Sequence, residues 1–346
     1  MLKDYLSQTI TGQDLSREDA REAMQVIMSG QASEAQIGAF LTAMRMKGES
    51  SIEVAGFAES MRSQALKVTC SAKTIIDTCG TGGDRQGTFN ISTAAAFVLA
   101  GAGLNVAKHG NRGVSSSCGS ADVLSALGIK LELSPEAVAA AIDTIGVGFI
   151  FAPSFHQAMK YAVKPRKELG FRTVFNLLGP LTNPANANCQ LIGVYDPKLT
   201  GKVAHALAEL GVTSALVVHS LDGLDEISTA SPTQVAEVRG EKIRSYVIEP
   251  AAYGFKRCTV ADYQGGTIEA NAQIIIELLK GEQGFKRDIV LMNAAAALVV
   301  ADAAGDMEEG IALAARSIDS GRAYAKLEAL QAFTQNCQDR GDLPLS

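Results

Sequence analysis

The feature that most constrains this fold is a short β-branched run that is followed at once by glycines and then by a helix-like series. Residues 74–77 have the composition of a buried strand, three glycines occur among residues 80–83, and an apolar series spans 93–102. This order is typical of a β-loop-α unit. Similar units recur along the chain, so the sequence predicts a mostly parallel sheet that is flanked by helices on both faces.

The later units are predicted from the same alternation of apolar runs and amphipathic series. Residues 233–248 have the pattern of a hairpin that turns at Gly240, and the tail over 267–333 is predicted to be helical, with a fully buried segment at 294–301. The remaining predicted strands are 105–107, 148–152, 190–194 and 215–219, and the remaining predicted helices are 121–127, 135–145 and 201–210.

The first seventy residues predict helices only. Ser16 precedes one apolar series, and Ser33 with Gln36 and Ser50 with Glu53 have capping-box spacing, which together predict three short helices. We therefore expect a small all-helical domain over 1–70 and a larger α/β domain over 71–346. Prolines and glycines interrupt the alternation over 161–188, and we expect part of 165–190 to join the helical domain.

Length, charge and cysteine content narrow the class of protein. The 346 residues fit roughly two domains, and the net charge of −6 argues against a main role in coating nucleic acid or an anionic membrane. The six cysteines include no C-x-x-C pair, which fits a reducing cytosol better than a disulfide framework or a zinc site. Neither a secretory signal nor a membrane span is visible, so we expect a cytoplasmic protein.

The loop after the first predicted strand is a candidate phosphate site. Residues 77–84 read DTCGTGGD, and residues 90–93 begin the following helix. Closely spaced glycines let backbone N–H groups converge on an anion, and the N-terminus of a helix adds further N–H groups. A glycine-rich turn without a ligand is an equal alternative for this loop taken alone.

The stretch after the second predicted strand is rich in hydrogen-bond donors. Residues 108–122 contain Lys108, Arg112, Asn111 and four serines, which suit phosphate oxygens and a ribose ring. A solvated surface loop is the alternative. Since both loops follow strands of one parallel sheet, we expect them to meet at its carboxyl edge, where α/β proteins bind ligands.

A third candidate is the acidic segment 222–226 after the predicted strand 215–219. Asp225 and Glu226 beside a phosphate site would hold Mg²⁺, which uses one or two protein carboxylates together with substrate phosphates. An ordinary acidic turn is the alternative for an isolated Asp-Glu pair.

Taken together, these motifs resemble those of the anthranilate phosphoribosyltransferase family. The resemblance covers nearly the whole chain and rests on GTGGD at 80–84, NIST at 90–93, KHGNR at 108–112, RTVFNLLGPLTNP at 172–184 and DGLDEIS at 222–228. Pyrimidine nucleoside phosphorylases carry a similar second loop but need no paired metal carboxylates. A nucleic-acid-binding protein on the same fold is a further alternative, which the net charge disfavours.

The resemblance implies a homodimer of the nucleoside phosphorylase and phosphoribosyltransferase type, with phosphoribosyl pyrophosphate (PRPP) and two Mg²⁺ ions in a cleft between the domains. It implies transfer of the phosphoribosyl group to the amine of anthranilate in tryptophan biosynthesis, without a covalent nucleophile. By matching motif, the implied PRPP ligands are Gly80, Gly83, Asp84, Thr88, Asn90, Ile91, Ser92, Thr93, Lys108, His109, Gly110, Asn111, Arg112, Gly113, Val114, Ser115, Ser116 and Ser120; the anthranilate contacts are Gly80, Asn111 and Arg166; and the metal ligands are Ser92, Asp225 and Glu226.

The chain departs from the family pattern near the implied anthranilate channel. Phe155 and Gln157 stand where family members often have a histidine or tyrosine and a proline, and Lys164 also differs, whereas Arg166 is retained. The departures therefore bear on the aromatic substrate more than on PRPP.

Overall fold

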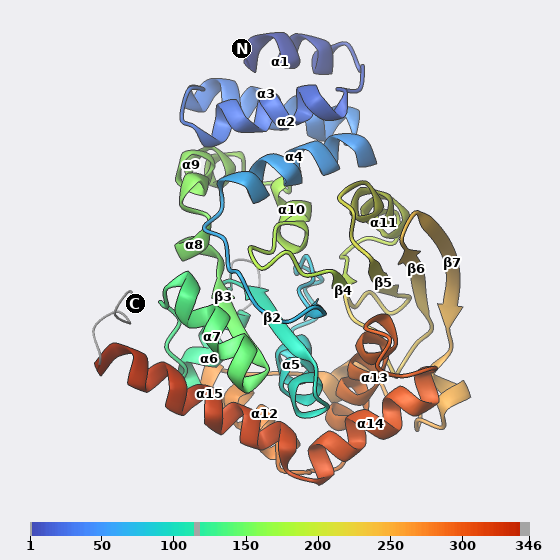
Figure 1. Cartoon of the computed structure of the whole chain (residues 1–346). Coiled ribbons are helices and arrows are strands. Elements are labelled where there is room, and N and C mark those ends of the chain that lie inside the picture. The colour runs from blue at the N-terminus through green and yellow to red at the C-terminus, as the bar shows by residue number, and fades with distance from the viewer. Residues whose placement is uncertain (1, 114–117, 340–346) are drawn as a thin grey trace.

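The computed structural model describes residues 2–113 and 118–339, and within them a helical part lies against one end of a larger α/β part (Figure 1). The described strands form one seven-stranded sheet in the order β3-β2-β1-β4-β5-β6-β7, in which β1 to β5 are parallel and β6 and β7 antiparallel. The predicted mostly parallel sheet is confirmed. Its strands are β1 (Ile75–Asp77), β2 (Asn105–Gly110), β3 (Val147–Phe151), β4 (Cys189–Gly193), β5 (Ser214–Ser220), β6 (Thr233–Arg239) and β7 (Lys242–Ile248).

Helices bury both faces of the sheet, as the apolar strands require. All residues of β4 and β5 are buried, and Leu216 and Ala215 belong to two different apolar clusters because successive side chains point to opposite faces. One face packs against α5 (Ile91–Gly101) and α13 (Phe285–Val300), and the other packs against α7 (Pro135–Ile145) and α11 (Leu199–Glu209).

The helical part begins at the N-terminus and uses the predicted caps. Ser16, Ser33 and Ser50 accept backbone hydrogen bonds at the starts of their helices, and the last two form complete capping boxes. The helices are α1 (Leu2–Ile10), α2 (Arg17–Met28), α3 (Glu34–Lys47) and α4 (Ser51–Gln64). The first of them was not predicted, because no capping signal precedes it and it fully buries only Leu2 and Thr9.

The chain returns to the helical part after β3. It runs through α8 (Ala152–Phe155), a 3₁₀ turn (Gln157–Met159), α9 (Lys160–Leu169) and α10 (Phe175–Leu181). α9 packs against α3, and α10 packs against α4, so Ala162 and Leu178 share an apolar cluster with residues of the first four helices. The stretch that disturbs the strand-helix alternation thereby lies between the two parts of the molecule (Figure 1).

The tail predicted to be helical over 267–333 consists of four separate helices. α12 (Ile268–Leu279), α14 (Met307–Asp319) and α15 (Arg322–Asp339) complete this tail together with α13. Elsewhere, α6 (Ser120–Ala126) lies between β2 and β3, and two 3₁₀ turns (Pro250–Tyr253 and Val260–Tyr263) precede α12. Gly284, Asp302 and Gly321 have positive φ between the helices of the tail, which explains the breaks. Within the predicted buried segment 294–301, residues 294–298 and 300 are buried, whereas Val299 and Ala301 are half-buried, so the prediction is confirmed except at these two positions.

One boundary prediction is wrong in a way that matters for the site. β2 extends to Gly110, so Lys108 and His109 lie on the strand rather than in the loop that follows it. Sheet pairing with β3 through residue 110 therefore fixes their backbones rigidly.

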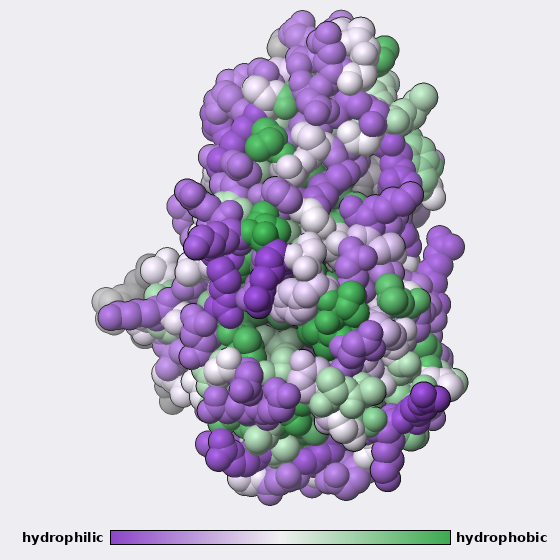
Figure 2. Space-filling view, turned by 90° about the vertical axis from the view of Figure 1, so that its right-hand side faces the viewer, coloured by the Kyte–Doolittle hydropathy of each residue, from purple (hydrophilic) through white to green (hydrophobic). Residues whose placement is uncertain are grey.

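The surface is mainly hydrophilic on the face seen in Figure 2, with apolar residues in small groups around the middle of the molecule. Among the described helices, none has the length and apolar content needed to cross a membrane.

Candidate active site

The predicted phosphate loops meet at the carboxyl edge of the sheet. Because β1, β2, β4 and β5 run parallel, the segments after Asp77, Gly110, Gly193 and Ser220 emerge on the same side. α10 lies over this edge, since the His109 Nδ1 is 3.1 Å from its Gly179 carbonyl oxygen. The edge is thus enclosed between the sheet and the helical part.

The first loop is a glycine turn pinned to the end of β4. Gly82 and Gly83 have φ of +62° and +87°, a backbone conformation that residues with a Cβ rarely adopt. The Thr81 N–H donates to the Gly193 carbonyl oxygen at 2.8 Å. A second backbone N–H of the turn, that of Gly82, donates to the Asp225 carboxylate, so the glycine turn lies directly against the acidic segment.

Two glycines allow the first loop and the acidic segment to approach each other. A Cβ at Gly80 would lie 3.1 Å from the Gly193 carbonyl oxygen and 3.4 Å from the Asp225 Oδ2. A Cβ at Gly193 would lie only 1.5 Å from the Asp225 backbone oxygen, so no other residue fits there. The sequence analysis missed Gly193; its signal was a glycine inside a predicted strand.

Lys108 connects the two loops. Its side chain is buried, and the Nζ donates to the Thr78 carbonyl oxygen at 3.1 Å and to the Ser92 Oγ at 3.2 Å. The ammonium group of β2 therefore lies between the β1 loop and the first turn of α5. A buried cation at the N-terminus of a helix is a favourable position for phosphate oxygens, because the positive end of the helix dipole adds to its charge.

Three carboxylates, those of Asp84, Asp225 and Glu226, lie close together at this edge of the sheet. Burial raises the pKa of both Asp225 and Glu226; the charge of Asp84 adds to the rise at Asp225, and the charges of Asp225 and Asp84 add to the rise at Glu226. A hydrogen bond from the Ser92 backbone and the charge of Lys108 oppose the rise at Glu226. The Asp84 Oδ2 is buried and has no hydrogen-bond partner among the described residues.

These acidic groups fit a divalent metal ion. Hard oxygen ligands with uncompensated negative charge are what Mg²⁺ prefers, and a cation there would relieve both the repulsion and the orphaned oxygen. Asp84 is predicted to bind PRPP, and the structure also places it beside Asp225, one of the predicted metal ligands. Its assignment to PRPP stays a prediction.

The second loop is closed by its own carboxylate. The Asp122 Oδ2 accepts the N–H groups of Gly113 at 2.8 Å and Gly119 at 2.9 Å, and its Oδ1 pairs with Arg112 at 3.0 Å. Arg112 is thus an exposed, paired cation rather than a free one. Three predicted PRPP residues, Val114, Ser115 and Ser116, lie outside the described residues.

The other predicted PRPP residues lie around the start of α5 and the end of the second loop. The Asn90 side chain donates to the Cys118 carbonyl oxygen at 3.2 Å, and the Ser120 Oγ donates to the Asn111 carbonyl oxygen at 3.4 Å. Thr88 forms a β-bridge with Gln264. Ile91 and Thr93 are buried in the first turn of α5, where the Thr93 hydroxyl has no partner among the described residues.

Two buried imidazoles and Arg166 lie toward α10. The rings of His109 and His156 are 5.1 Å apart, and burial lowers their pKa values to about 3 and about 4, so both are neutral at pH 7. Arg166 lies over the ring of Phe175 at 5.0 Å, and burial lowers its pKa. Neutral imidazoles and a desolvated guanidinium suit an aromatic acid.

The departures from the family pattern differ in their surroundings. Phe155 is buried in a small apolar cluster with residues of β1, β2 and α7. Gln157 is exposed, and Lys164 pairs with Glu34 at 2.6 Å on the surface of the helical part. Two of the three substitutions therefore lie on the surface.

A tighter group of ligating side chains does not fit a metal ion. Ligand atoms of Asp77, Cys79 and His109 lie within 4.8 Å of one another. However, the Asp77 oxygens already accept hydrogen bonds, from the Asn183 Nδ2 at 2.7 Å and from the His109 N–H at 3.2 Å. Asp77 is therefore a structural carboxylate that fixes β1 to β2.

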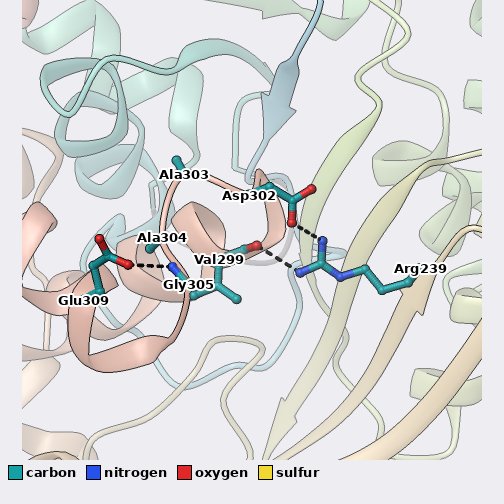
Figure 3. A pocket seen from close by; sticks show the side chains of 7 residues that line it. All are labelled: Arg239, Val299, Asp302, Ala303, Ala304, Gly305 and Glu309. Atoms are coloured by element: carbon teal, nitrogen blue, oxygen red, sulfur yellow. Dashed lines mark hydrogen bonds and ion pairs between the residues drawn. The ribbon is translucent and has the colours of Figure 1, made fainter.

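One cavity lies at the opposite edge of the sheet (Figure 3). It has a volume of about 410 Å³ and is lined by Arg239, Val299, Asp302, Ala303, Ala304, Gly305 and Glu309. Arg239 pairs with Asp302 at 2.7 Å, and Glu309 accepts the Gly305 N–H at 2.7 Å. Since these polar groups satisfy each other, the cavity offers little to a ligand.

The fold and the site together define a class of protein: an α/β enzyme that handles a phosphorylated ligand beneath a helical bundle. Comparison with known families agrees. Residues 3–65 match the helical bundle domain of a glycosyl transferase family, and residues 72–324 match the α/β domain of a glycosyl transferase family.

Individual relatives narrow this class. The chain is 55% identical over 336 residues to the anthranilate phosphoribosyltransferase of Moorella thermoacetica, covering 97% of this chain and 99% of that protein. The structure of the Thermus thermophilus anthranilate phosphoribosyltransferase has a TM-score of 0.92 at 42% identity, covering 96% and 99% of the two chains. That of the Saccharomyces cerevisiae enzyme in complex with PRPP and Mg has a TM-score of 0.89 at 30% identity, covering 97% and 98%. The chain belongs to the anthranilate phosphoribosyltransferase family.

Proposed function

We propose that this chain transfers the phosphoribosyl group of PRPP to the amine of anthranilate, giving N-(5-phosphoribosyl)anthranilate and pyrophosphate in tryptophan biosynthesis. One observation carries the proposal: the buried Lys108 ammonium joins the glycine loop to the N-terminus of α5, opposite the acidic pair Asp225 and Glu226. Family membership and the yeast complex with PRPP and Mg support it.

The chemistry follows from what the site stabilises. The aromatic amine of anthranilate is neutral at pH 7 and already nucleophilic, so departure of pyrophosphate from the ribose is the difficult step. Lys108 and the glycine-loop N–H groups meet the negative charge that develops on the leaving group. Positioning of the amine beneath α10 supplies much of the rest, and no side chain needs to act as a nucleophile.

Magnesium use belongs to the same proposal. When bound, the metal would neutralise charge on the pyrophosphate, and Ser92, Asp225 and Glu226 would hold it, with Asp84 beside them. We propose two ions for each chain. Calorimetric titration of Mg²⁺ into protein saturated with pyrophosphate measures that number, and a ratio of one would contradict it.

The assignment of substrate-binding residues is also a proposal. Gly80, Asn111 and Arg166 contact anthranilate, while the residues after β1 and β2 named above bind PRPP. Arg166→Ala should raise the KM for anthranilate and leave that for PRPP nearly unchanged, because only the guanidinium fork matches a carboxylate. An equal loss for both substrates would remove Arg166 from the aromatic site.

Assembly, domain division and location complete the proposal. Exposed apolar side chains on the helical part, which include Ile10, Met46, Val163 and Phe171, support a homodimer through that part. We place the domain boundary near residue 70 and assign part of 165–190 to the helical domain. None of the described cysteines forms a disulfide bond, which supports a cytoplasmic location.

The direct experiment is an assay with purified protein, PRPP, Mg²⁺ and anthranilate, which follows the loss of anthranilate fluorescence. Turnover should require all three additions. Phosphorolysis of a pyrimidine nucleoside in the same assay would favour the phosphorylase alternative, against which the acidic pair Asp225 and Glu226 argues.

A further inference from the structure

A guanidinium from the interdomain segment reaches the glycine loop. Arg172 lies between α9 and α10, outside every motif residue assigned to a ligand above. Its Nη2 donates to the Gly83 carbonyl oxygen, and the guanidinium lies 3.9 Å from the centre of the Tyr195 ring. Among the described residues, no ion pair includes Arg172, so its cation is devoted to these two contacts.

The same turn is held from its other side by the end of β4. The Tyr195 N–H donates to the Thr81 Oγ1 at 3.2 Å, and the Thr81 N–H donates to the Gly193 carbonyl oxygen. Glycines contribute no side-chain contacts, and they lose much conformational freedom when a turn is fixed. Backbone contacts such as that from Arg172 must therefore hold Gly82 and Gly83 in their left-handed conformations.

We infer that Arg172 is a positioning residue for the phosphate site. By binding the Gly83 carbonyl group and stacking on Tyr195, it keeps the N–H groups of the glycine loop directed at the pyrophosphate of PRPP. Because Arg172 belongs to the segment that joins the two parts of the molecule, it also makes PRPP affinity depend on how the helical part sits over the sheet. This inference rests on the proposed function.

Four single substitutions test it. Arg172→Ala should raise the PRPP KM by about tenfold, which corresponds to loss of one charge-assisted contact, while the anthranilate KM changes less than twofold. Arg172→Lys should recover part of the loss, since it keeps a cationic donor without the planar stacking surface. Tyr195→Leu should raise the PRPP KM by a smaller factor. Arg244→Ala is the control, since Arg244 also lies over a tyrosine ring, Tyr246, on the distant β7.

Amide hydrogen exchange separates positioning from direct contact with the substrate. In ligand-free protein, Arg172→Ala should speed exchange over residues 80–86 and leave α5 unchanged. Unaltered exchange would overturn the inference: with a raised PRPP KM it would show direct contact with the substrate, and with an unaltered PRPP KM it would show no role in the site. If Arg172→Ala fails to fold, a wild-type PRPP KM in both Arg172→Lys and Tyr195→Leu would overturn it equally.

Failure of the proposed function has a different signature. Wild-type protein that neither binds PRPP in calorimetry nor consumes anthranilate would contradict the function itself. If the wild-type protein does both and the variants have its PRPP KM and exchange rates, only the role of Arg172 is contradicted.

Discussion

The loops after β1 and β2 are both predicted to bind PRPP, but they are fixed in different ways. The β1 loop is held by segments far away in sequence: Gly193 and Tyr195 after β4, Arg172 before α10, and Gln264. The β2 loop is closed by Asp122, which binds the backbone at both ends of the same short stretch. One loop therefore depends on the whole fold, and the other depends mainly on itself.

This difference predicts that the two loops respond to different changes in the molecule. A loop held from both parts of the molecule can transmit their relative arrangement to the ligand, whereas a locally closed loop presents its donors whatever that arrangement is. Substitutions in distant segments should therefore act on the β1 side. Lys108, which starts on β2 and ends among β1-loop atoms, is the point at which the two sides are coupled.

The largest effect is expected at the acidic pair beside the β1 loop. Glu226→Gln should lower turnover at least about 100-fold, a loss typical of removing one electrostatic stabiliser of a developing charge. The same change should raise the thermal stability of metal-free protein, because it removes one of two carboxylates that repel each other. Activity assays and calorimetry check both parts, with the exposed Glu249→Gln as control.

Chelation of magnesium should reproduce the loss of turnover in wild-type protein. Undiminished turnover in excess chelator would show that turnover does not depend on a metal ion at the acidic pair beside the β1 loop.

Lys108→Ala should produce the next largest loss. The buried ammonium binds the start of the β1 loop and the first turn of α5, and loss of a charge-assisted contact should weaken PRPP binding by about 1.5–3 kcal/mol, or roughly ten- to hundred-fold. Calorimetry with PRPP and Mg²⁺ measures it. If binding remains at the wild-type level, Lys108 does not couple the loops and has only a structural role.

A smaller loss is expected from opening the β2 loop. Asp122→Ala removes the ionised acceptor for two backbone N–H groups, and a hydrogen bond to a charged group contributes about 1.5–3 kcal/mol, only part of which reaches the ligand. We expect PRPP binding to fall by about tenfold. Asp122→Asn should lose less, since its amide oxygen can still accept one bond. Hydrogen exchange at 80–86 should stay unchanged in both variants; a change there would show that the loops are not fixed independently.

Much of the fold was predictable because its signals are local. The β-glycine-helix order predicted the parallel sheet, and the serine caps predicted α2, α3 and α4 within a residue or two. The hairpin at Gly240 was also confirmed. α1 lacks such a signal, and the extension of β2 through Lys108 depends on pairing with β3, which no local pattern reveals.

The candidate site was predictable only where a motif carries it. Lys108, Asp225 and Glu226 were singled out, and the structure brings them together. Gly193, Arg172 and the pairing of Arg112 with Asp122 were missed, because each acts through a contact that depends on tertiary packing. Close backbone approach and stacking leave little trace in a single sequence.

The last and smallest expected effect concerns stability rather than turnover. β2 continues from Lys108 to His109, whose ring lies beside that of His156, and burial lowers both pKa values to about 3 and about 4. Free histidine has a pKa near 6.5, so below that pH the unfolded chain binds protons that the folded chain refuses. Stability should therefore be complete above pH 6.5 and fall by about 1.4 kcal/mol per histidine for each pH unit below it. Urea unfolding at pH 7.0 and pH 5.5 measures this slope. His156→Gln should reduce the slope, whereas the control His205→Gln, on the exposed face of α11, should not. An unchanged slope in His156→Gln would mean that other groups cause the loss of stability in acid, and that the buried imidazoles beside β2 do not contribute to it.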